Sequence, residues 1–278
     1  MGRDLNDIRH RRIWLKTLAT PYFFGASVIG PLHVQLAMPC QDSFAFKTID
    51  EDFAVAAIAD GLGSASKADI GAKVAVKSAV KSVERAIKAT AIATAIATHK
   101  SVDITTLAKD AVTAARRALE KRAKTEECSL RDLACTLLVA ITLRDAVAAV
   151  HIGDGALVVD TDNGLHLITG PGESEYTNEV TPLTSQDWEE SLKSTSAVSG
   201  VNGIALFTDG CQRAGLKKAD NNYAPFEGFF RPLFTYATQI DDFEQANQDI
   251  YDLLASDKLS EHSEDDKTLV LGILPKGT

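Results

Sequence analysis

Cysteine is scarce in this chain and never forms a closely spaced pair. The four cysteines among the 278 residues (Cys40, Cys128, Cys135 and Cys211) include no CxxC motif. A disulfide framework is therefore not indicated, and free thiols are typical of a reducing compartment. We expect the chain to be cytoplasmic.

Long apolar runs and an excess of positive charge are also missing. The first residues, MGRDLNDIRHRRIW, are charged where a secretory signal needs an apolar stretch, and no run of about 18 apolar residues follows. We therefore expect neither secretion nor a membrane span. The net charge is −9, from 29 basic and 38 acidic residues, and no segment concentrates Lys and Arg on one face. A nucleic-acid partner is not expected.

What is present is the composition of a globular protein. Hydrophobic residues make up 45% of the chain and charged residues 24%, so a core can form without metals or disulfides. The length is compatible with one domain. We expect a single domain over residues 1–278, with an N-terminal extension at 1–25 and a long surface excursion at about 170–200. The sequence does not specify an oligomeric state.

The pattern of apolar residues predicts the secondary structure. Apolar runs joined by short polar turns predict three hairpins, with strands at 44–49 and 53–59, 135–143 and 146–152, and 156–160 and 165–169. Further apolar strands are predicted at 203–208 and 268–274, and helical spacing predicts helices at about 67–88, 103–124 and 242–255. Segment 89–101 mixes helix-forming Ala with Thr and Ile, so it is compatible with a loop or a frayed helix. Hairpins with helices gathered in two blocks predict an α+β fold, a four-layer α-β-β-α sandwich of two packed antiparallel sheets flanked by helix pairs.

Acidic residues mark the ends of several predicted strands. Asp60, Asp154 and Asp209 each lie at a strand end and are followed by glycine, while Asp42 and Asp265 come just before a strand. A single Asp-Gly pair is most often a turn. Several strand ends can converge, however, and carboxylates brought close together repel one another unless cations neutralise them. The pattern therefore predicts a metal site.

The ligand types indicate which metal. Oxygen ligands favour Mg²⁺ or Mn²⁺, whereas zinc usually recruits His or Cys, and the chain has neither an HExxH motif nor a CxxC pair. Glycine after an aspartate, as at Gly61, lets a backbone carbonyl approach an ion closely. We predict Mn²⁺ or Mg²⁺ as the cofactor.

Five short motifs carry a resemblance to a known family. They are PCQD at 39–42, ADGLG at 59–63, GDG at 153–155, TDG at 208–210 and DDKT at 265–268. In this order they resemble the signatures of the metal-dependent protein phosphatases, the type 2C serine/threonine phosphatases, over about residues 28–274. Each motif alone is weak, but five in the family order are hard to reach by chance. The spacing of Gly30 and His33, and of Glu175, Tyr176 and Asn178, is similar to a bacterial branch.

The resemblance implies a function and a set of roles. It implies that a water activated by two metal ions hydrolyses phosphoserine and phosphothreonine, and that a flap lies within the 170–200 excursion. It further implies that Asp60 bridges two ions, that Gly61 offers its carbonyl to one, that Asp209 and Asp265 bind the first ion, and that Asp42 assists through water. Asp60, Asp209 and Asp265 are thus the predicted catalytic residues. The predicted metal-binding set is Asp42, Asp60, Gly61, Asp154, Asp209 and Asp265.

Other polar residues near the motifs carry separate predictions. Asp154 resembles the position at which bacterial members hold a third, looser ion together with Asp209. Asp266 is predicted to be a structural partner of its loop, because the family places the metal ligand first in this pair. His151 lies inside an apolar strand, which is typical of a hydrogen-bonded core histidine. His33 is predicted either to contact phosphate or to be structural.

The sequence departs from the family at three positions. Gln41 stands where a glutamate is usual, Ala37 where many members have an arginine that grips phosphate, and Leu62 where some members have a histidine. His33 or an arginine of the N-terminal run are the candidates to replace the missing arginine. These departures leave a second hypothesis, a phosphatase-like binding module without catalysis that recognises a kinase or phosphoprotein. The retained aspartates favour an active enzyme whose partner is a phosphorylated protein, with a cognate serine/threonine kinase as one candidate.

Overall fold

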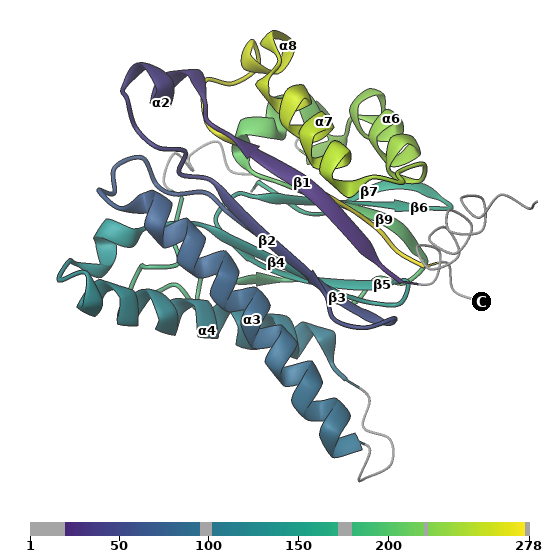
Figure 1. The fold of residues 1–278 in the computed structure, drawn as a ribbon, viewed down its shortest axis with the longest axis horizontal. Helices are drawn as coiled ribbons and strands as arrows, with labels where there is room; N and C mark the ends of the chain where they lie inside the picture. The colour runs from purple at the N-terminus through teal and green to yellow at the C-terminus, as the bar shows by residue number, and fades with distance from the viewer. Residues whose placement is uncertain (1–19, 95–101, 172–179, 220–221, 276–278) are drawn as a thin grey trace, which may run out of the picture.

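Two five-stranded antiparallel sheets packed face to face form the centre of the computed structural model (Figure 1). The structure describes residues 20–94, 102–171, 180–219 and 222–275. The first sheet has the strand order β1-β12-β9-β6-β7 and the second β2-β3-β4-β5-β8. The strands are β1 (Tyr22–Val28), β2 (Ser43–Thr48), β3 (Phe53–Ala59), β4 (Leu137–Leu143), β5 (Ala146–Ile152), β6 (Ala156–Thr161), β7 (Gly164–Thr169), β8 (Lys193–Ser194), β9 (Val201–Phe207) and β12 (Lys267–Ile273).

Strand β3 shows how the apolar residues determine the layers. Successive side chains of a strand point to opposite faces of a sheet. Ala54, Ala56 and Ile58 are accordingly buried in the core between the two sheets, while the residues between them pack in the core beneath the helices of the second sheet. A strand buried on both faces reads as a continuous apolar run, as this one does.

One helix pair covers each sheet from outside. Helices α3 (Ala68–Thr94) and α4 (Ile104–Thr125) pack on the second sheet, and α6 (Glu227–Ala237) and α7 (Phe243–Ala255) pack on the first (Figure 1). Helix α4 begins after Asp103, whose carboxylate accepts hydrogen bonds from the backbone N–H groups of Thr105 and Thr106. The predicted α+β fold of four layers is confirmed.

Short elements complete the chain. They are α2 (Pro31–Gln35), η1 (Leu130–Leu133), η2 (Asp209–Cys211), α5 (Gln212–Gly215), β10 (Leu216–Ala219), β11 (Asn222–Pro225) and α8 (Asp257–Ser260). Within the described residues no helix is both long enough and apolar enough to cross a membrane.

The structure differs from the sequence expectation in four places. Strand β1 begins at Tyr22, so the last residues of the expected 1–25 extension belong to a sheet. Helix α3 continues to Thr94, and the rest of the undecided 89–101 segment lies outside the described residues. Of the 170–200 excursion, residues 172–179 are also outside them, and the remainder contains β8. Helix α6 forms despite Pro232. Its buried apolar face, with Phe230 and Phe234, offsets a proline cost of about 3 kcal/mol.

Candidate metal centre

The strand register brings the five predicted aspartates to one edge of the sandwich. Ser43 pairs with Ala59, which places the residue before β2 beside the residue after β3. Phe207 pairs with both Leu269 and Ala156, which places the end of β9 beside the starts of β12 and β6. The aspartates that flank these strands, Asp42, Asp60, Asp154, Asp209 and Asp265, therefore lie at the same edge.

Asp60 leaves β3 through a fixed backbone. Its N–H donates to Thr136 Oγ1 at 2.9 Å, and its carbonyl accepts from the Thr136 N–H at 2.7 Å. A Cβ on Gly61 would lie 2.8 Å from the Cβ of Ala68, so only glycine permits this close approach to the start of α3. The turn leaves the Asp60 carboxylate close enough to the other acidic strand ends to feel their charges.

Asp42 is buried, and only one of its two carboxylate oxygens has a hydrogen-bond partner in the described structure. Its Oδ2 accepts from Thr208 Oγ1 at 2.7 Å, and that same hydroxyl accepts from the Thr268 N–H at 2.9 Å. Its Oδ1 is buried and has no hydrogen-bond partner in the described part of the chain. Burial raises the pKa of Asp42 to about 8, and the neighbouring carboxylates of Asp266 and Asp209 add to the rise.

Asp154, Asp209 and Asp265 line one cleft of about 800 Å³. The Oδ1 atom of Asp209 is buried and, among the described residues, finds no hydrogen-bond partner. Burial, followed by the charges of Asp154 and Asp265, raises the pKa of Asp209 to about 7, and burial also raises the pKa of Asp154. Gly153 holds the turn before Asp154 with φ +105°, a conformation that favours glycine. The carbonyl of Asp154 accepts from Gln212 Nε2 at 2.8 Å, which joins this turn to α5.

The negative charges of the other four aspartates all act on Asp60. Burial raises its pKa well above the usual range, and Asp42, Asp209, Asp265 and Asp154 each raise it further. Every one of these effects disfavours negative charge. The edge therefore gathers more carboxylates than a protein stabilises without a compensating positive charge.

The donor set fits a hard divalent cation. All the convergent side chains are carboxylates, and two of their buried oxygens lack a partner in the described structure. As they stand, however, no three His, Cys, Asp or Glu side chains of the described residues form a group that could hold one ion. Mg²⁺ usually keeps several waters and binds through one or two carboxylates, so a site for this ion does not need three side chains on it. The two unsatisfied buried oxygens, Asp42 Oδ1 and Asp209 Oδ1, and the all-oxygen donor set fit Mg²⁺ or Mn²⁺.

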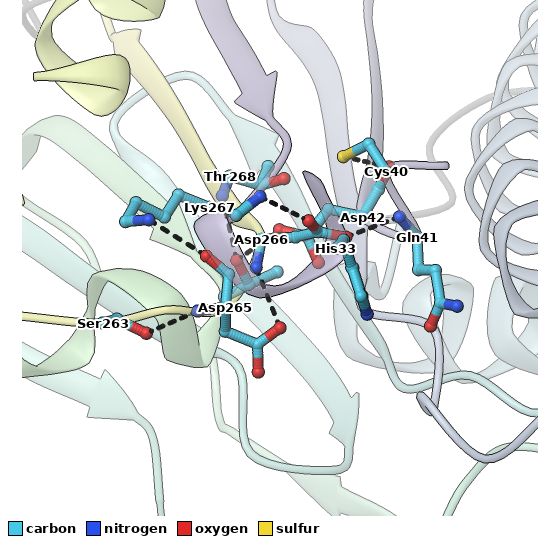
Figure 2. A network of polar contacts seen from close by, with 11 residues as sticks. His33, Cys40, Gln41, Asp42, Ser263, Asp265, Asp266, Lys267 and Thr268 are labelled. Carbon is cyan, nitrogen blue, oxygen red and sulfur yellow. Dashed lines mark hydrogen bonds and ion pairs between the residues drawn. The ribbon is translucent and has the colours of Figure 1, made fainter. Parts of the chain in front are cut away.

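Asp266 has a structural role beside this site (Figure 2). Its Oδ1 accepts from the Gly30 N–H at 2.7 Å, and its Oδ2 accepts from the Gln41 N–H at 2.6 Å. His33 Nδ1 lies 2.9 Å from the same Oδ2. The buried carboxylate thus connects β12 with both ends of the segment that contains α2. This agrees with the prediction that Asp266 supports its loop.

The two histidines of the prediction lie in different surroundings. His151 is buried in β5, and its ring contacts Thr169 Oγ1 and the carbonyl of Gly153, as expected of a core histidine. Burial lowers its pKa to about 4. His33 is held against Asp266 and is not among the residues that line the cleft.

The cleft contains residues that sequence reasoning missed. Arg213 and His262 line it together with the three aspartates, and Leu32 of α2 contributes an apolar wall. Arg213 is the only arginine or lysine lining this cleft in the described structure. The available signal was its place three residues after the TDG motif, in the short helix α5 that follows the strand end. No periodicity marked it.

Comparisons with known proteins agree with the fold and the site. Residues 29–255 match the family described as Protein phosphatase 2C. The chain is 31% identical over 255 residues to Serine/threonine-protein phosphatase 3 of Escherichia coli (strain K12), covering 89% of this chain and 96% of that protein. The catalytic domain of the phosphatase PstP, solved with 2 manganese ions, has a TM-score of 0.57 at 18% identity, covering 91% of this chain and 98% of that one. Stp1 from Staphylococcus aureus has a TM-score of 0.53 at 12% identity, covering 91% and 94%.

The fold and the acidic edge are those of a metal-dependent phosphatase of the sandwich type, and the comparisons identify its family. The chain belongs to the protein phosphatase 2C family. The predicted family is therefore confirmed, and with it a serine/threonine protein phosphatase, an enzyme that acts on phosphorylated protein.

Proposed function

We propose that the acidic edge is the catalytic centre of this phosphatase and that Asp60, Asp209 and Asp265 hold its two ions. Asp60 would hold both, with the carbonyl of Gly61 as an additional ligand, and Asp154 with Asp209 would hold a third, looser ion. The observation that carries this proposal is the convergence of Asp60 with four other aspartates at a single edge of the sandwich. When bound, the ions lower the pKa of a water and neutralise charge on the phosphoryl oxygens.

The protein's own groups position this chemistry. Thr208 holds Oδ2 of Asp42 and leaves Oδ1 free to accept a hydrogen bond from a water in the site. Arg213 would grip the phosphate from the wall of the cleft, the role that the sequence prediction gave to His33 or an N-terminal arginine. Asp266 would keep the segment from Gly30 to Gln41 in place beside the site.

The proposed partner is a phosphorylated protein, with a cognate serine/threonine kinase as a specific candidate. The four cysteines are all free thiols. This supports a reducing compartment, and we infer the cytoplasm.

Hydrolysis of a phosphothreonine peptide with and without Mn²⁺ tests the proposal. We expect the wild type to require Mn²⁺, and Asp209→Asn to lose about a hundredfold or more in kcat/KM. Glu264→Gln is the matched control, because Glu264 lines the same cleft and loses the same charge but is not a proposed ligand. Equal losses in the two variants would contradict the ligand assignment. Metal-dependent binding of the peptide without hydrolysis would favour the binding module.

A further inference from the structure

A second pocket lies next to the cleft and has the opposite charge. It is a cavity of about 450 Å³ between α5, β10, α6, α7 and α8. Its inner surface is apolar: Leu216, Leu233 and Leu259 are buried beneath it, and the partly buried Phe226 and Phe229 also line it. A volume of this size is in the range of ligand-binding pockets.

The rim of this pocket is basic. Arg213, Lys217, Lys258 and His262 line it, and no Asp or Glu is among its lining residues. Lys217 Nζ lies 3.7 Å from the centroid of the Phe226 ring, which holds the ammonium at the mouth. None of the four forms an ion pair with a carboxylate within the described residues. In a chain of net charge −9, a rim without acidic groups favours an anionic occupant.

The pocket adjoins the cleft. Arg213 and His262 line both, so a chain that places a phosphorylated side chain in the cleft can extend across them into the pocket. From these shared lining residues and the charge of the rim we propose that the pocket docks the substrate polypeptide through a large apolar side chain flanked by acidic residues. The N-terminal run of this chain is a poor complement, because it carries Arg9, Arg11 and Arg12. The inference rests on the proposed function and names the class of substrate sequence that the enzyme selects.

Neighbouring lysines of β10 allow a matched test. Lys217 lines the pocket, whereas Lys218 is exposed and does not. Binding of a fluorescein-labelled, unphosphorylated peptide with a Leu-Phe pair between glutamates is measured by anisotropy. We expect Lys217→Glu to weaken binding about threefold to tenfold, Lys258→Glu to act in the same way, and Lys218→Glu to change it by less than about twofold. Replacing Leu-Phe by Ser-Ser in the peptide should weaken wild-type binding by a similar factor.

Hydrolysis separates this inference from the proposed function. In Mn²⁺, kcat/KM for a phosphothreonine peptide that carries the acidic and apolar segment should fall in Lys217→Glu, while hydrolysis of p-nitrophenyl phosphate should not. Equal effects of Lys217→Glu and Lys218→Glu on peptide binding would overturn the docking site even if both enzymes are active. Tighter binding by a synthetic peptide of residues 1–19 would also overturn it, by assigning the pocket to the chain's own N-terminus. Absence of all metal-dependent hydrolysis would refute the proposed function, and the anisotropy result would still decide whether the pocket binds the peptide.

Discussion

Replacement of Asp266 by asparagine should destabilise the fold far more than the same change at Asp265. The Asp266 side chain is 1% exposed and accepts hydrogen bonds from the Gly30 N–H, the Gln41 N–H and His33 Nδ1. An amide keeps only one acceptor oxygen. If that oxygen serves Gln41 and His33, the NH₂ group faces the Gly30 N–H, and a buried donor is left without a partner.

The magnitude follows from these three contacts. A buried donor without a partner costs about 1–3 kcal/mol, and each of the two remaining bonds is weaker by about 1 kcal/mol when the acceptor loses its charge. The expected loss in the free energy of unfolding is therefore about 3–5 kcal/mol, in the range measured when one member of a buried pair is removed. In Asp265→Asn the oxygen that accepts from the Asp266 N–H can remain, and the side chain is exposed. We expect this control to change the stability of the metal-free protein by less than about 0.5 kcal/mol.

Urea unfolding in EDTA measures both variants without metal. With a slope of about 3 kcal/mol/M, the midpoint of Asp266→Asn should fall by roughly 1–2 M, while that of Asp265→Asn should stay near wild type. Similar midpoints for the two variants would refute the structural role of Asp266. A larger loss in Asp265→Asn would mean that the roles of the two residues are reversed.

Three further predictions concern the backbone, the core and the metal. Gly210→Ala places a Cβ 1.9 Å from the Asp266 carbonyl oxygen, so the melting temperature should fall by several degrees, at about 2–4 °C per kcal/mol. A Cβ on Gly63 meets nothing within 4 Å, so Gly63→Ala should melt like wild type. Equal melting temperatures of the two variants would contradict this prediction. Because burial lowers the pKa of His151 from 6.5 to about 4, the unfolded chain binds more protons between these values and stability falls as pH falls through this window, by about 2 kcal/mol at pH 5. Metal-free urea unfolding at pH 7 and pH 5 should therefore show a smaller pH dependence in His151→Gln, and an unchanged one would refute it. The pKa of Asp42 is shifted in the opposite direction, to about 8, so the folded metal-free protein keeps protons that a cation must displace. Mn²⁺ should therefore raise the melting temperature more at pH 8 than at pH 6. An equal rise at the two pH values would count against the metal site.

Most of the fold could be predicted because apolar patterning specifies it locally. The hairpin of β2 and β3 and the helix pair α3 and α4 follow from runs and periods in the sequence itself. Helix α6 could not be predicted, since Pro232 argues against a helix and only the packing of its apolar face on the first sheet offsets that preference. Strand β1 was missed because an N-terminal segment shows its pairing with β12 only in three dimensions.

The residues of the candidate site also divide into those that the sequence pattern marks and those that it does not. Asp60 and Asp209 were predictable because each ends an apolar strand and is followed by glycine. The separate tasks of Asp265 and Asp266 were predicted only through the family resemblance, although burial distinguishes them clearly in the structure. Arg213 was missed because its place on the wall of the cleft depends on how α5 turns after β9.

We propose that Asp60 belongs to a metal centre that hydrolyses phosphothreonine. Phosphate release from a phosphothreonine peptide, measured against Mn²⁺ concentration in wild type and Asp60→Asn, tests it most directly. We expect activity in the wild type that saturates with Mn²⁺ and disappears with EDTA, and a loss of about a hundredfold or more in a folded Asp60→Asn. Metal-independent release by the wild type, or an Asp60→Asn variant with wild-type activity, would rule out a catalytic metal centre at Asp60.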